Sequence, residues 1–104
     1  MGKDLIYIPA DFSVAINAEP LSGLTMDEYD FDVEIYSRTR TRSVKFKKSQ
    51  LKRKGENSYV APIGSAVIGA GIVNVRMIAR IPDDDYDGGM REDVAEYKTD
   101  IECV

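Results

Sequence analysis

Apolar and polar residues alternate one by one in several short stretches of this chain, most clearly at residues 11–18 and 31–36. A two-residue period places successive side chains on opposite faces of a strand and predicts that one of those faces is buried. Stretches rich in Gly, Pro and Asp separate these runs, as turns do. No segment keeps the 3.6-residue period of a long helix. The chain is therefore predicted to be all-β.

The same pattern predicts where the strands and turns lie. Val44 and Phe46 continue the alternation of residues 31–36 with opposite parity, so a hairpin or bulge is expected near Ser37–Arg42. Pro62 predicts an edge position or a strand end. Strands are predicted at residues 11–18, 31–36, 44–47, 58–63, 72–81 and 92–103, with turns or loops at 19–29, 54–57, 64–71 and 83–89. The inner face of the last strand is predicted to hold Ala95, Tyr97, Thr99, Ile101 and Cys103.

Strands of this number and length are typical of a small antiparallel sandwich. A chain of 104 residues is long enough for one core, so residues 1–104 are predicted to form a single domain. The predicted fold is an immunoglobulin-like β-sandwich of about seven strands. The chain has no Trp and one Cys, so the Cys and Trp residues of antibody cores are absent.

The composition argues against catalysis. The chain has no His, which is the commonest general base and transition-metal ligand, and its one cysteine, Cys103, has no basic partner of that kind. The apolar run Leu5–Ile8 is too short for a signal segment or a membrane span. We therefore predict no enzyme activity, no cofactor and no membrane association, and expect the chain to stay in the cytosol where it is made.

Two glycine-containing patterns resemble ligand-binding loops. Asp83, Asp85 and Asp87 with the following Gly88 match the start of a calcium loop, but the twelfth position is Val94 where a bidentate Glu is needed. These three aspartates are a weak calcium candidate, and the alternative is a solvated turn. Gly69-Ala-Gly71 resembles a dinucleotide loop but precedes a strand, which favours a tight turn.

The basic residues are concentrated in the middle of the chain. No acid interrupts the run from Arg38 to Lys54, whereas acids dominate the last quarter. The block is predicted to be the partner-binding surface, because opposite poles suit docking on a charged neighbour or self-association between copies. Its members are Arg38, Arg40, Arg42, Lys45, Lys47, Lys48, Lys52, Arg53 and Lys54. A solvated hairpin with charges that protect its edges is the alternative.

Two other classes of binding protein stay open. Clustered cations beside Tyr36 and Phe46 could hold nucleic acid, but the net charge of −4 makes that partner unlikely in an isolated domain. A carbohydrate-binding sandwich needs exposed aromatic rings, and without Trp it would depend on tyrosines. The tyrosines that could serve are Tyr36, Tyr59, Tyr86 and Tyr97.

The second half of the chain resembles a known group of phage proteins. Gly69-Ala-Gly71, the strand that follows, and Ile81-Pro-Asp-Asp-Asp-Tyr-Asp-Gly-Gly-Met-Arg-Glu-Asp-Val94 resemble a G-x-G, strand, I-P-D-x-D-(Phe/Tyr)-x-D-G-x-R-x-E-V pattern. That pattern occurs in small virion proteins of phages and prophages of gut Bacteroidetes, including crAss-like phages. It is also similar to the N-terminal immunoglobulin-like module of upper-baseplate and fibre-anchoring proteins. Gly89 is one residue more than the pattern contains.

The resemblance implies an immunoglobulin-like attachment module of a phage particle without an active site. The chain ends at Val104 without a fibre-like extension, which favours an auxiliary (decoration) capsid protein. Its partners would be the major capsid protein or other virion proteins, and its location would be the virion, assembled in the bacterial host cytoplasm. A baseplate or head-fibre attachment adaptor is the alternative, and a nucleic-acid-binding accessory protein comes after it.

Overall fold

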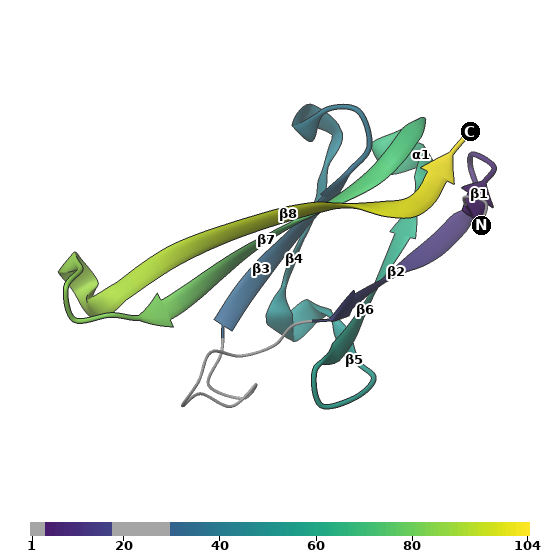
Figure 1. Cartoon of the computed structure of the whole chain (residues 1–104). Helices are drawn as coiled ribbons and strands as arrows, with labels where there is room; N and C mark the ends of the chain where they lie inside the picture. The colour runs from purple at the N-terminus through teal and green to yellow at the C-terminus, as the bar shows by residue number, and fades with distance from the viewer. Residues whose placement is uncertain (1–3, 18–29) are drawn as a thin grey trace.

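The computed structural model describes residues 4–17 and 30–104, which form two β-sheets facing each other (Figure 1). In chain order the elements are β1 (Asp4–Ile6), β2 (Asp11–Asn17), β3 (Asp30–Tyr36), the 3₁₀ turn η1 (Arg40–Arg42), β4 (Val44–Lys47), the 3₁₀ turn η2 (Lys48–Gln50), β5 (Lys52–Arg53), β6 (Ser58–Gly64), α1 (Ser65–Ile68), β7 (Gly71–Pro82), the 3₁₀ turn η3 (Asp87–Gly89) and β8 (Met90–Cys103). The predicted all-β class is confirmed.

The order of strands is that of an immunoglobulin sandwich. One sheet has the order β1-β8-β7-β3-β4, and the other has the order β2-β6-β5. When β2 to β8 are lettered B, C, C′, D, E, F and G along the chain, the sheets read G-F-C-C′ and B-E-D, as in immunoglobulin domains. The predicted immunoglobulin-like sandwich is confirmed, with eight described strands where about seven were expected.

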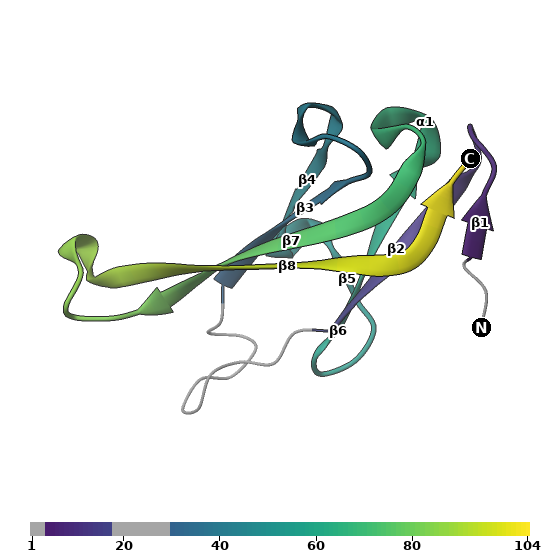
Figure 2. The same cartoon turned by 45° about the horizontal axis from the view of Figure 1, so that its top comes forward.

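The first strand extends the larger sheet in a way that the sequence did not predict. β1 pairs with the end of β8 in parallel, from Asp4 opposite Ile101 to Ile6 opposite Cys103. Two further hydrogen bonds continue the pairing: the amide of Val104 donates to the carbonyl of Ile6 at 2.9 Å, and the amide of Ile8 donates to the carbonyl of Val104 at 2.9 Å. The first and last described strands therefore lie side by side (Figure 2).

The core lies between the two sheets and is almost entirely apolar. Phe31 on β3 is fully buried and contacts Tyr59 on β6 edge to face, with the ring centroids 5.5 Å apart. Aliphatic side chains such as Val14 on β2 and Val75 on β7 fill the region where antibody domains hold the disulfide between these strands. The buried core comprises Val14, Ile16, Phe31, Val33, Ile35, Leu51, Tyr59, Ala61, Ile63, Ile68, Val73, Val75, Ala79, Ile81 and Cys103.

Most predicted strands form where the alternation placed them. The predicted change from odd-numbered to even-numbered apolar positions occurs in the connection that contains η1. As a result, Val33 lies opposite Phe46, and Ile35 lies opposite Val44. Pro62 belongs to the middle strand of the smaller sheet, but β5 pairs only with Tyr59 and Val60, so Pro62 lies at a local edge. Part of the connection at residues 64–71 is the short helix α1. The strand end at Ala18 and the predicted turn and loop at 19–29 lie outside the described residues.

The predicted inner face of the last strand is wrong for half of its length. Cys103 is buried, and Ile101 packs against the core, but Ala95 and Tyr97 are exposed. The β7–β8 hairpin extends beyond the smaller sheet in both views, so none of the described strands faces this part of β8 (Figures 1 and 2). An alternating pattern gives the face of a residue, but the overlap of the two sheets decides whether that face is covered.

Substitution of Phe31 by Ala should lower the free energy of unfolding by about 3–5 kcal/mol, because the cavity left between the sheets is only partly refilled. Urea denaturation followed by circular dichroism measures this change. Val67→Ala is the control, since Val67 is 53% exposed and should change stability by less than about 1 kcal/mol. A loss below about 1 kcal/mol for Phe31→Ala would contradict the core described above.

Candidate functional site

The nine residues of the predicted basic surface occupy the connection from β3 to β6, where the chain crosses from one sheet to the other. Arg38, Arg40 and Arg42 lie in the β3–β4 connection, and the lysines lie on β4, η2 and β5 and just after β5. All nine are exposed except Lys48, which is partly buried. The predicted residues therefore lie at the surface, but they extend along the molecule and do not form one compact cluster.

Three arginines of the basic surface make contacts within the domain. Nε of Arg40 lies 2.9 Å from a carboxylate oxygen of Glu34. Arg42 donates to the backbone carbonyl of Ala66, and Arg53 donates to the carbonyls of Gly55 and Glu56. These arginines hold loops in place.

Glycine at position 69 suits the backbone of this turn. A Cβ atom at Gly69 would lie 2.7 Å from Nη1 of Arg42, and the φ angle of 82° also favours glycine. Ser37 donates to the carbonyls of Ile68 and Gly69, which joins the same two loops. The Gly69-Ala-Gly71 pattern is thus part of a tight turn against the β3–β4 connection, as the sequence favoured.

Glu34 is a buried carboxylate that the sequence pattern did not predict. It lies on the outer face of β3 but is only 3% exposed, because the β3–β4 connection covers it. Burial disfavours its charged form, but hydrogen bonds from Ser43 and Arg40 outweigh this effect and lower the pKa of Glu34. Its charged neighbours are evident only from the strand register of the structure, which places Glu34 opposite both Lys45 and Arg76.

A second group of ion pairs joins β3 to β7. Arg80 donates two hydrogen bonds of 3.0 Å to Asp32 and one of 2.8 Å to Asp30. The hydrogen bond from Arg80 lowers the pKa of Asp32, and the two carboxylates raise the pKa of Arg80. Arg80 thus holds β7 against β3 at this end of the sheet.

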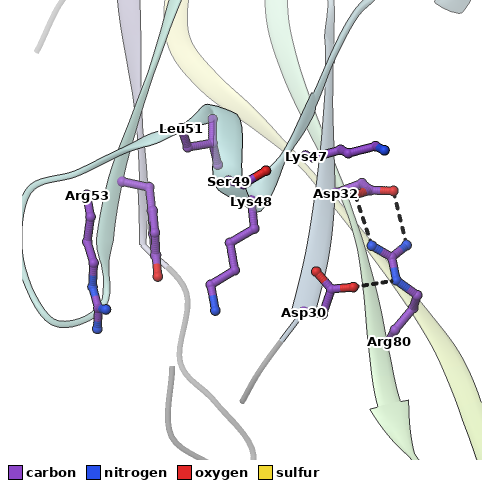
Figure 3. Close-up of a pocket in the computed structure, with 9 residues that line it drawn as sticks. Asp30, Asp32, Lys47, Lys48, Ser49, Leu51, Arg53 and Arg80 are labelled. Carbon is purple, nitrogen blue, oxygen red and sulfur yellow. Dashed lines mark hydrogen bonds and ion pairs between the residues drawn. The ribbon is translucent and has the colours of Figure 1, made fainter. Parts of the chain in front are cut away.

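A hollow of about 810 Å³ lies beside this cluster and is lined from both sheets (Figure 3). Its lining residues are Asp30, Asp32, Lys47, Lys48, Ser49, Leu51, Arg53, Tyr59 and Arg80. Tyr59 is only 3% exposed, and its hydroxyl has no hydrogen-bond partner among residues 4–17 and 30–104. Clustered lysine and arginine side chains can stabilise a carboxylate or another anion. The hollow is the best candidate site for an anionic group of a partner.

The other candidate residues are not brought together into ligand sites. Asp83 accepts hydrogen bonds from the amide of Asp85 and, at 3.0 Å, from Arg91, so it is engaged without a metal. Across residues 4–17 and 30–104, no three acidic, Cys or His side chains are placed to hold a metal ion. Cys103 is 1% exposed, and burial raises the pKa of its thiol, which disfavours the reactive thiolate.

The four tyrosines named for carbohydrate binding divide into two pairs. Tyr36 and Tyr59 are buried, and Tyr36 donates a hydrogen bond to Glu96. That hydrogen bond and burial raise the pKa of Tyr36. Tyr86 and Tyr97 are 51% and 43% exposed and lie on the β7–β8 hairpin. The buried pair is therefore unavailable as a stacking platform.

The fold and the surface together define a small immunoglobulin-type β-sandwich with a lysine-rich edge. Comparison with protein families, curated proteins and solved structures found no match. In the part of the chain that is described, no helix has the length and apolar character to cross a membrane.

The loss of stability at low pH should reflect the protonation of Glu34. Its folded-state pKa is lower than its ordinary value of 4.5, so its charge stabilises the fold above pH 4.5, and this contribution is lost as the pH falls through the lowered value. Glu34→Gln should destabilise the domain by about 1–3 kcal/mol at pH 7 and by less at pH 3. Urea denaturation at both pH values, with the exposed Glu56→Gln as control, measures the difference. Equal losses at both pH values would contradict this assignment.

Proposed function

We propose that this chain is a non-enzymatic structural protein of a phage virion, an auxiliary (decoration) protein that binds the major capsid protein. The proposal rests on the resemblance of residues 69–94 to small virion proteins. The immunoglobulin strand order supports it, because the same fold is implied by that resemblance. A fold alone does not define a function, so the surface must supply the binding chemistry.

The observation that carries the proposal is the group of basic side chains that lines the hollow. Lys47 and Lys48 line it together with Arg53, while the charge of Arg80 is matched by two aspartates. An acidic side chain on a partner would meet positive charge at this hollow. We therefore propose that acidic loops of the capsid surface dock here.

The charge distribution favours a protein partner over nucleic acid. A sequence-independent nucleic-acid site needs a continuous track of cations along the phosphate backbone. Here Arg40 and Arg42 are engaged within the domain, and Asp30 and Asp32 lie in the wall of the same hollow. Alternating charges of this kind select a complementary protein surface and oppose a uniformly negative polymer.

Replacement of both Lys47 and Lys48 by Ala should weaken binding to particles that lack this protein by about tenfold or more, because two charge-assisted contacts are lost. Lys98→Ala is the matched control, since it removes an exposed lysine from β8, outside the basic surface. Co-sedimentation with the particles gives the affinity, and thermal unfolding checks that each variant folds. Unchanged binding of the folded double variant would refute docking through the hollow.

The copy number in purified particles decides between the two virion roles. Quantitative mass spectrometry relative to the major capsid protein should give a stoichiometry close to that of the capsid subunit. A few tens of copies or fewer would instead favour a baseplate or head-fibre adaptor. Absence from the particles would overturn the structural role altogether.

A further inference from the structure

The larger sheet has two open edges with opposite charge. β1 covers only residues 101–103 of β8, so among the described residues no strand pairs with the outer edge of β8 from Met90 to Asp100. At the other edge, β3 is the one described strand that pairs with β4. Glu92 and Glu96 lie on the first edge strand, and Lys45 and Lys47 on the second. Open edges of this kind are templates for pairing with another chain.

Charge alternates from strand to strand on the outer face of this sheet. The register places Lys45 of β4 opposite Glu34 of β3, Glu34 opposite Arg76 of β7, and Arg76 opposite Glu96 of β8. Arg76 and Glu96 form an ion pair of 3.4 Å. This alternation of positive and negative side chains continues only if the next strand beside β8 carries positive side chains.

Strand direction also favours a positively charged strand such as β4 beside β8. β4, β3, β7 and β8 are antiparallel to their neighbours throughout. β8 therefore runs opposite to β4, and a second copy placed in the same orientation beside β8 presents its β4 as an antiparallel neighbour. Both the backbone polarity and the charge of β4 match the open edge of β8.

We propose that copies of this chain associate head to tail, with β4 of one copy pairing with the open edge of β8 of the next. The pairing goes beyond the proposed docking function, because it needs no other protein. In the proposed register Lys45 lies opposite Glu96, and Lys47 lies opposite Val94. On the inner face, Phe46 then lies opposite Ala95, and Val44 lies opposite Tyr97.

Neighbouring registers are disfavoured by the same side chains. A shift of two residues in one direction places Lys45 opposite Lys98, and a shift in the other direction places Phe46 opposite Asp93. The proposed register instead covers Val94 and Tyr97, which are 50% and 43% exposed in the single chain. Because β4 has only four residues, the contact is small, and we expect association at high concentration or on a particle surface.

Sedimentation velocity from about 10 μM to 1 mM tests the association. The wild-type chain should form dimers and longer species as its concentration rises, and less so at high salt, which screens the charge pairs. Val94→Lys should weaken association about tenfold by facing Lys47 of the next copy, whereas Val67→Lys, an equally exposed valine in α1, should not. A monomer at every concentration would overturn the proposal.

Cross-linking between two variants that each carry one added cysteine tests the register. Lys47→Cys and Val94→Cys, mixed under mild oxidation, should form a disulfide-linked heterodimer, and neither variant alone should form a dimer through the new cysteine. Efficient dimerisation of Val94→Cys by itself would indicate symmetric β8–β8 pairing and overturn the head-to-tail arrangement. Because Val94 lies outside the basic surface, the Val94→Lys variant should still bind capsid as single copies, which separates this inference from the docking function.

Discussion

The burial of Phe31, Val33 and Ile35 on one face of β3 is the contact on which the rest of the structure depends. These side chains are at most 1% exposed and join the larger sheet to the smaller one. Because side chains alternate between the two faces of a strand, Asp32 and Glu34 then point outward. They lie between β4 and β7, which carry Lys and Arg. The burial of alternate β3 side chains in the core therefore determines which charged side chains lie on the outer face of the sheet.

The basic block of the sequence has two different roles in the structure. Arg40, Arg42 and Arg53 bind Glu34 or backbone carbonyls, and so fix the connections at the edges of the sandwich. Its lysines lie on β4, η2 and β5 and face solvent or the hollow. The planar guanidinium can satisfy several acceptors at once, whereas a lysine is a mobile point charge. This difference explains why the two residue types separate.

Local pattern was sufficient to predict the strands but not their neighbours. Alternation identified β2, β3, β4 and β7, and turn residues placed the breaks between them. The parallel pairing of β1 with β8 and the exposure of Tyr97 depend on which segments meet across the fold, and these contacts leave no local trace. Glu34 was missed for the same reason, since its burial comes from a connection that folds back over β3.

The parallel pairing of β1 with β8 also determines how the domain would respond to mechanical tension. Asp4 lies beside Ile101 at one end of this pair, and Ile6 lies beside Cys103 at the other. A force that draws Asp4 and Val104 apart acts along both strands in opposite directions. The backbone hydrogen bonds between them are then loaded together in shear, and no single bond can open first as it would at the end of a hairpin. The two strands would act as a clamp that resists extension before the core is reached.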